Sequence, residues 1–368
     1  MPTPSAVHRV PVAAIKGRGA ATALAHRFSA EARTAFDDGW PPSDAEVVES
    51  RPPPTRIFFE TVKSVISRND SPDIAFELSI NPYRGCEHGC SYCYARPTHS
   101  YLSLSPGLDF ETQIIAKQNI VEVLRAELGA PRYRPALLNI GSVTDAYQPV
   151  ERELGLTRGV IGVLQACRHP FSLITKGSGV ERDLDLIAPM AAQGLAAVYV
   201  TITTLDAALA RRMEPRAASP ARRLRTLATL AQAGVPVGVS VAPQIPFIND
   251  DMEQVLEAAW AAGARSAFYT VLRLPFELAP LFREWLALHY PGRAARVMAR
   301  VQEMRGGQDY QADFATRMKG QGLWADLIRQ RFEKTCARLG YHRQRVALDL
   351  SRFDASRLHG QGSLFGDA

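Results

Sequence analysis

Apolar and polar positions alternate along the chain with two different spacings. Short runs of apolar, often β-branched residues, which are typical of buried strands, recur at 75–80, 136–140, 171–175, 197–203, 235–241 and 266–272. Between these runs, apolar residues return every three or four positions, which predicts amphipathic helices at 112–128, 152–167, 181–193, 205–233 and 250–262. The fourth of these helices is expected to break at Pro215 and Pro220.

This regular alternation of strand and helix predicts an α/β protein. Near-continuous apolar strands separated by helices are typical of parallel sheets covered by helices, and six such units would form a partial (β/α)6 TIM-like barrel over residues 72–275. Residues 1–71 are rich in proline and mixed charge, which predicts a largely irregular N-terminal extension. Helical periods at 281–288, 294–304 and 323–339 predict a helical C-terminal region, 276–368, that ends in a disordered tail.

Composition narrows the class of protein. Of the 368 residues, 46% are hydrophobic and 22% are charged, which is close to the globular average and excludes a wholly disordered chain. Apolar runs stay far below the roughly 18–20 residues of a membrane span, so we expect a soluble, cytoplasmic protein. The net charge of +6 is concentrated near the C-terminus and in the arginine-rich segment 211–225, which could face phosphates or form a solvated helix surface.

Three of the five cysteines fall within eight residues, directly after the first predicted strand. Cys86, Cys90 and Cys93 have the spacing Cys-x3-Cys-x2-Cys, with glycines at 85 and 89 that permit a tight backbone. Thiolates so close together repel one another unless a metal neutralises them. Structural zinc would need a fourth ligand, such as His88 or His99, whereas three cysteines on an iron–sulfur cube would leave one iron open.

This spacing, with the aromatic Tyr92 before the last cysteine, resembles the motif of the radical S-adenosylmethionine (SAM) superfamily, and the resemblance covers about residues 75–275. It implies that Cys86, Cys90 and Cys93 hold a 4Fe-4S cluster whose open iron binds the amine and carboxylate of SAM. It further implies reductive cleavage of SAM to a 5′-deoxyadenosyl radical, in a lyase or a transferase or oxidoreductase, with a reductant such as flavodoxin or ferredoxin as partner.

Barrel enzymes carry their active residues at the carboxyl ends of the strands, where this sequence has several polar groups. In the resemblance, Asp145 is the nearest match to the acidic turn that binds the methionine ammonium, and Lys176 would complement the methionine carboxylate. Thr203 would bind the ribose, and Ala242 and Ile245 would contact the adenine. Tyr92 and Thr144 complete the set of residues expected to bind the cofactor.

The substrate is less clearly marked. The lysine after the third strand and the segment 211–216 are similar to the spore photoproduct lyase branch, and the whole chain resembles bacterial proteins of the PA0069/Rv2578c type. That lyase returns hydrogen from a cysteine near the end of its second strand, and residues 137–148 contain none, so dimer repair itself is not expected.

The C-terminal tail also bears on the substrate. Gln361, Leu364 and Phe365 resemble the peptide by which bacterial DNA enzymes dock on the sliding clamp, although Gly362 departs from it. With the basic C-terminal region, this favours a nucleic acid, as in DNA repair or modification, over the alternative of a peptide or small metabolite. A non-enzymatic zinc module that binds nucleic acid is a further alternative, which iron content would separate.

Overall fold

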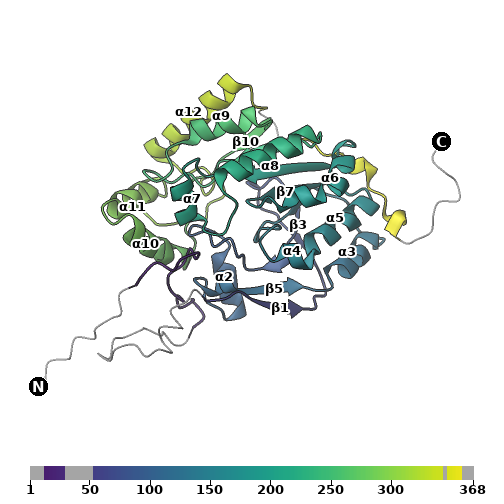
Figure 1. The fold of residues 1–368 in the computed structure, drawn as a ribbon, viewed down its shortest axis with the longest axis horizontal. Coiled ribbons are helices and arrows are strands. Elements are labelled where there is room, and N and C mark those ends of the chain that lie inside the picture. The colour runs from purple at the N-terminus through teal and green to yellow at the C-terminus, as the bar shows by residue number, and fades with distance from the viewer. Residues whose placement is uncertain (1–11, 30–52, 343–345, 359–368) are drawn as a thin grey trace, which may run out of the picture.

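A twisted sheet of seven strands forms the centre of the protein. The computed structural model describes residues 12–29, 53–342 and 346–358. The strand order is β10-β9-β8-β7-β6-β3-β2, and every neighbouring pair is parallel except β2 with β3 at the edge. The six parallel strands confirm the predicted partial barrel, and each lies within or next to one of the six apolar runs (Figure 1).

The ten strands are β1 Arg56–Glu60, β2 Ile66–Arg68, β3 Leu78–Ile80, β4 Tyr83–Arg84, β5 Gln113–Lys117, β6 Leu138–Ile140, β7 Phe171–Thr175, β8 Ala196–Thr201, β9 Val237–Ser240 and β10 Ser266–Phe268 within the described residues. The α-helices there are α2 Asp109–Thr112, α3 Ile120–Gly129, α4 Glu151–Leu154, α5 Leu156–Ala166, α6 Leu184–Ala191, α7 Ala207–Met213, α8 Pro220–Gln232, α9 Met252–Ala261, α10 Leu278–His289, α11 Ala294–Glu303 and α12 Gly322–Leu339. Short 3-10 helices are η1 Arg96–Leu102, η2 Gly179–Asp183, η3 Leu350–Arg352 and η4 Ala355–Leu358.

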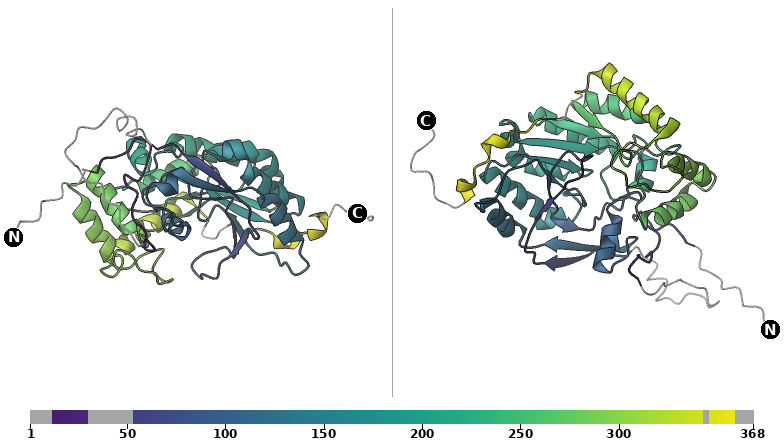
Figure 2. Two further views of the ribbon diagram at one scale, coloured as in Figure 1. Left: turned by 90° about the horizontal axis from the view of Figure 1, so that it is seen from below. Right: turned by 180° about the vertical axis from the view of Figure 1, so that it is seen from behind.

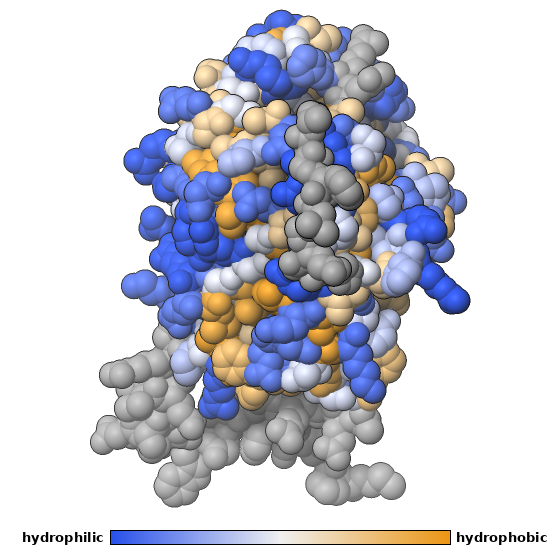
Figure 3. All heavy atoms as spheres, turned by 90° about the vertical axis from the view of Figure 1, so that its right-hand side faces the viewer, coloured by the Kyte–Doolittle hydropathy of each residue, from blue (hydrophilic) through white to orange (hydrophobic). Residues whose placement is uncertain are grey.

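Helices cover one face of the sheet, and the alternation along each strand explains why. In β7, Phe171 and Leu173 point into the apolar core that the strands share with α3, α5, α6, α8 and α9, while Ser172 and Ile174 face the barrel interior. Figure 2 shows these helices gathered on one side of the sheet. On the face seen in Figure 3, hydrophobic patches lie between hydrophilic side chains. Because the helices pack on the outer face of the sheet, its inner face can carry polar side chains.

One predicted helix is wrong in its first half. The range 112–128 contains β5 followed by α3, because Ile114 and Ala116 alternate into a small apolar cluster while β5 pairs with β1 and β4. The range 205–233 divides into α7 and α8, and α8 begins at Pro220, as the sequence predicts.

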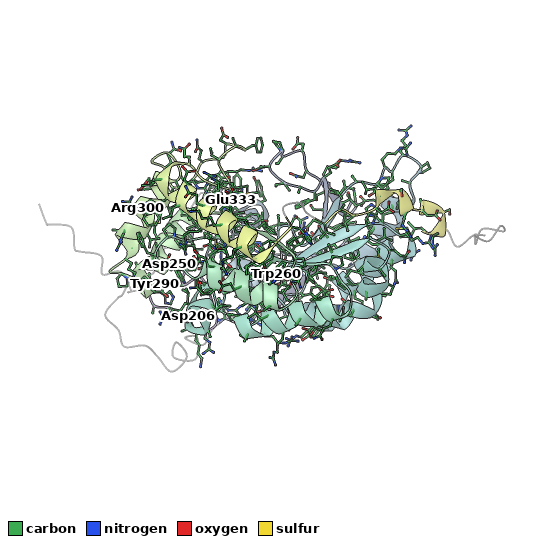
Figure 4. The ribbon with its side chains drawn as sticks, turned by 90° about the horizontal axis from the view of Figure 1, so that it is seen from above. Asp206, Asp250, Trp260, Tyr290, Arg300 and Glu333 are labelled. Carbon is green, nitrogen blue, oxygen red and sulfur yellow. The ribbon has the colours of Figure 1, made fainter. Side chains whose placement is uncertain are left out.

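The helices after residue 275 pack beside the barrel. Helix α12 lies along α9, joined by the ion pair of Arg331 with Glu253 at 2.6 Å, and Figure 4 shows the two helices side by side near Glu333 and Trp260. Helices α10 and α11 form a second apolar cluster that also includes Cys90 and Tyr92. Among the described residues, no helix is long and apolar enough to cross a membrane.

Candidate functional site

The cysteine loop, residues 86–93, follows β4 and is shaped by two glycines. Gly85 and Gly89 have φ angles of +80° and +66°, the left-handed region that side chains with a Cβ rarely adopt. A Cβ on Gly89 would lie 2.6 Å from the carboxylate Oε2 of Glu111. The loop can therefore curl this tightly against its neighbours only because position 89 has no side chain.

The three cysteines of this loop lie close together and carry free thiols. Cys86 and Cys90 are buried and Cys93 is half-buried. Burial raises the pKa of the Cys90 thiol to about 12, although the ammonium of Lys176 opposes the rise. Burial also raises the pKa of Cys86, and the carboxylate of Asp145 and the neighbouring thiols add to that rise. Sulfurs packed in this way carry charge only when a metal balances it, which fits an iron–sulfur cluster held by three thiolates.

A buried arginine and glutamate hold the loop from below. Arg96 is fully buried, donates from Nε to the Cys90 carbonyl at 2.8 Å, and forms an ion pair with Glu111. The other donors to the Glu111 carboxylate are the backbone amides of Gly19 at 3.0 Å and Ala20 at 2.8 Å. The N-terminal segment is thereby fastened beneath the loop.

The two histidines considered as zinc ligands are engaged elsewhere. Nδ1 of His88 lies 3.2 Å from the carboxylate of Asp145, and Nε2 of His99 lies 3.0 Å from the carbonyl of Gln113. In the part of the chain that the structure describes, no three His, Cys, Asp or Glu side chains are grouped closely enough to hold a single metal ion. Because His88 and His99 contact other groups, the three cysteines remain as the donors of the loop, and three cysteine ligands fit an iron–sulfur cluster better than a closed four-ligand zinc site.

A cavity of about 440 Å³ runs from the cysteine loop through the barrel interior. Cys90 and Cys93 lie on its wall at one end. Polar side chains from successive strands line its middle, namely Asn139, Ser172, Thr201 and Ser240. A group bound by the cysteines would therefore face a cavity that carries several hydrogen-bonding groups.

Three of the predicted cofactor-binding residues also line this cavity. Tyr92 and Lys176 lie on its wall beside the cysteine loop, with the Lys176 ammonium 5.7 Å from the centre of the Tyr92 ring, and Ala242 lines the cavity at the end of β9. The structure thus brings together the cysteines, one cation and one small apolar residue.

Asp145 lies behind the loop and is absent from the cavity lining. Its carboxylate accepts hydrogen bonds from the Thr175 hydroxyl at 2.6 Å, the Lys176 amide at 2.7 Å and the Tyr147 amide at 2.9 Å, and it contacts His88. Burial alone would raise the pKa of Asp145, but His88 and these donors hold it well below its ordinary value. In this arrangement Asp145 joins the ends of β6 and β7 to the cysteine loop.

The other three predicted residues also lie outside the cavity lining. Thr144 donates its hydroxyl to the Gly85 carbonyl at 2.6 Å, and Thr203 donates its hydroxyl to Glu214 at 3.1 Å. Ile245 is buried in the apolar cluster shared with Tyr92. The side chains of these residues contact the protein around the loop.

Glu214 is a residue of the site that the sequence analysis did not select. It is fully buried, pairs with the equally buried Arg223, and accepts the hydroxyl hydrogens of Tyr92 and Thr203. Burial alone would raise the pKa of Glu214, but Arg223 and Lys176 lower it. The only signal in the sequence is that Glu214 is a single acid among the arginines of segment 211–225.

Sequence reasoning also did not identify the residues at the outer rim of the cavity. Asp73 and Arg317 form a two-pronged ion pair across it, at 2.5 and 2.6 Å, and Arg273 stands nearby over the ring of Tyr94. Asp73 and Arg317 are separated by 244 positions, and no local pattern in either segment links them.

Comparison with known proteins places this geometry in a family. Residues 80–259 match the model of the Radical SAM superfamily. Protein Rv2578c of Mycobacterium tuberculosis strain H37Rv is 38% identical over 246 residues, which are 65% of this chain and 72% of that protein. Protein MJ0683 of Methanocaldococcus jannaschii is 26% identical over 212 residues, covering 58% and 76% of the two chains.

Solved structures that align with this chain include spore photoproduct lyase, with a TM-score of 0.49 and 16% identity over 77% of this chain and 78% of that one. The methyltransferase TsrM of Kitasatospora setae aligns with a TM-score of 0.40 and 14% identity over 62% of this chain and 37% of that one. The extent of the match to Rv2578c, together with the family model, shows that the chain belongs to the radical SAM superfamily, whose enzymes use a 4Fe-4S cluster and SAM.

Proposed function

We propose that this protein is a radical SAM enzyme that acts on nucleic acid. The observation that carries the proposal is that one loop brings three free cysteines together and sets two of them on the wall of the barrel cavity. When bound, the reduced cluster supplies the electron that splits SAM into methionine and a 5′-deoxyadenosyl radical, which takes a hydrogen atom from the substrate. The barrel keeps water away from that radical.

In this proposal Cys86, Cys90 and Cys93 are the cluster ligands, and the cavity residues receive SAM. Lys176, beside the cysteines, would bind the methionine carboxylate, and Ala242 would leave room for the flat adenine. For Asp145 we propose an indirect role in SAM binding. Because its carboxylate is engaged by several donors, its contribution to SAM binding would be to fix the backbone of Lys176.

Charges and rings at the cavity rim support an anionic, aromatic substrate. Arg273, Arg317 and Lys319 line the rim, whereas the acid there, Asp73, is paired with Arg317. Tyr94 and Tyr269 add aromatic surfaces to the same lining. Cations that meet phosphates beside rings that stack on bases are the combination used to bind nucleic acid, which favours this substrate over a peptide or a small neutral metabolite.

Iron content and product formation test the radical chemistry. The protein, purified without oxygen and reconstituted, should hold about four irons per chain and release 5′-deoxyadenosine when reduced with SAM present. Cys90→Ala should lose most of the iron and all of the product. Cys336→Ala, which changes a half-buried cysteine on α12, is the matched control and should keep both. Product from Cys90→Ala at the level of the parent protein would refute the proposal.

Binding to DNA tests the substrate separately. The affinity for a labelled duplex or damaged oligonucleotide should fall with salt, with a log–log slope of about 0.9 for each phosphate contacted. Arg273→Ala should weaken binding and flatten the slope by about one contact. Absent or salt-independent binding would reject the nucleic acid and leave the radical chemistry standing. The clamp-like peptide at 361–365 lies outside the described residues. We propose that it docks on a sliding clamp, and deletion of these residues tests this separately.

A further inference from the structure

A second hollow lies on the opposite side of the cysteine loop from the barrel cavity. It measures about 720 Å³, and we call it the arginine groove because Arg152, Arg182, Arg216, Arg222 and Arg225 line it. The cysteine loop contributes His88 to this groove, whereas its Cys90, Tyr92 and Cys93 line the barrel cavity. The same short loop therefore has one face in each hollow.

The arginine groove carries an excess of positive charge. Three of its five arginines are paired with acids: Arg182 with Glu151 and with Asp183, each at 2.8 Å, Arg216 with Glu87 at 3.0 Å, and Arg222 with Glu181 at 2.5 Å. Arg152 and Arg225 are exposed, and neither forms an ion pair within the described ranges. A surface of this kind attracts an acidic partner and speeds its approach.

The groove is rigidly connected to the cysteine loop. His88 is buried, with Nδ1 3.2 Å from Asp145, and its carbonyl accepts the backbone amide of Arg216 at 3.3 Å. Arg216 also pairs with Glu87 of the loop at 3.0 Å. A molecule seated in the groove would thus rest against His88, which lies between Cys86 and Cys90 in the loop.

We propose that the arginine groove is the docking site of an acidic electron-transfer protein of the flavodoxin or ferredoxin class. This inference rests on the proposed function, because SAM cleavage consumes one electron that must enter from outside. One electron would leave the reduced flavin or iron–sulfur centre of the donor, which is thereby oxidised by one equivalent, and would reduce the oxidised cluster that Cys86, Cys90 and Cys93 would hold. In the proposed function the barrel cavity receives SAM and substrate, and a donor in the arginine groove would reach the same loop without entering that cavity.

The groove is less suited to the nucleic-acid substrate. A nucleotide that lay along the five arginines would have the cysteine loop between itself and the barrel cavity, where the hydrogen atom must be taken. Arg273, which forms no ion pair among the described residues, lies on the cavity side and can serve the substrate there. Two separate positive surfaces on either side of the loop therefore fit two different partners.

The test is a charge reversal of the two unpaired arginines, R152E together with R225E, in the full-length reconstituted protein. Both side chains are exposed, so the variant should fold. The matched control is R132E, an exposed arginine in the connection between α3 and β6. Binding of a purified, fluorescently labelled bacterial flavodoxin is measured first, followed by the rate at which its reduced form reduces the cluster, observed by electron paramagnetic resonance.

We expect R152E/R225E to weaken flavodoxin binding and to slow cluster reduction by at least about tenfold, with the salt dependence largely lost, while R132E changes neither. Cluster reduction and product formation driven by dithionite, which needs no docking, should match the parent protein. Loss of dithionite-driven product from the parent itself would refute the proposed function instead. The docking proposal is overturned if flavodoxin binding is unchanged in the variant, or if the variant loses only binding to a DNA duplex.

Discussion

Breaking the ion pair between Glu214 and Arg223 should destabilise the protein far more than breaking its half-buried neighbour, Arg222 with Glu181. Both side chains of this pair are essentially fully buried, with exposed fractions of 0% and 1%. The adjacent arginine of the same helix, Arg222, pairs with Glu181 at exposed fractions of 32% and 22%. The two pairs share the same chemistry and the same helix, so the difference between them isolates the effect of burial.

The magnitude follows from what each substitution leaves behind. Glu214→Gln leaves the buried guanidinium of Arg223 without its charged partner, which lowers the free energy of unfolding by about 3–5 kcal/mol. Arg223 keeps two carbonyl acceptors, Ala218 at 2.7 Å and Thr201 at 2.9 Å, so we expect the lower end, about 3 kcal/mol. Glu181→Gln leaves Arg222 in contact with water and should cost less than about 1 kcal/mol.

Urea denaturation followed by far-ultraviolet circular dichroism measures both losses in the cluster-free protein. Removal of both charges together, Glu214→Met with Arg223→Met, should recover part of the loss, because an apolar pair of similar size leaves no stranded charge. Iron content after reconstitution should also fall in Glu214→Gln, since the carboxylate that accepts the Tyr92 hydroxyl beside the cysteines is replaced by a neutral amide, a weaker acceptor. Equal losses for Glu214→Gln and Glu181→Gln would refute the reasoning from burial.

Three further outcomes are expected. Burial lowers the pKa of His169 to about 4, below its ordinary 6.5, so the stability that the neutral side chain provides above pH 6.5 is lost as the pH falls toward 4. The free energy of unfolding should therefore be about 2 kcal/mol lower at pH 5 than at pH 7, and His169→Asn should not show this loss. Gly89→Ala should lower iron loading and stability, whereas Gly155→Ala, with a φ of +63° and open space around it, should cost only about 1 kcal/mol. Asp73→Asn should free Arg317 and increase hydrogen exchange at 313–319 without changing exchange in β7, and unchanged exchange at 313–319 would argue against a closing contact at the rim.

Local signals in the sequence were sufficient for the barrel. A parallel strand covered by helices reads as an apolar run whatever its neighbours are, and β7 occupies the predicted run 171–175 without a shift. The three cysteines were likewise visible, because cluster ligands on one loop must be close in sequence. These features depend on contacts between residues a few positions apart.

Strand β5 shows where such reasoning ends. The apolar residues Ile114 and Ala116 fit the start of a helix as well as they fit a strand, and α3 does begin three residues after β5 ends. The choice is made by pairing with β1, whose partner residues lie 57 positions earlier in the chain, as in the register of Phe58 with Ile115. No window along the sequence contains both strands.

The contacts of the predicted site residues could not be read from the sequence either, and these contacts change how mutations near the cysteines should be interpreted. Thr144, Asp145 and Thr203 stand at the strand ends where sequence reasoning places them, but each hydroxyl or carboxylate bonds to protein groups instead of lining the cavity. A tightly curled buried loop presents many polar backbone atoms, and each must be paired. Arg96 pairs the Cys90 carbonyl and is itself held by Glu111, while Glu214 accepts the Tyr92 hydroxyl. Both carboxylates come from segments outside the loop, so substituting either should resemble loss of a cysteine ligand although neither lines the cavity beside the cysteines.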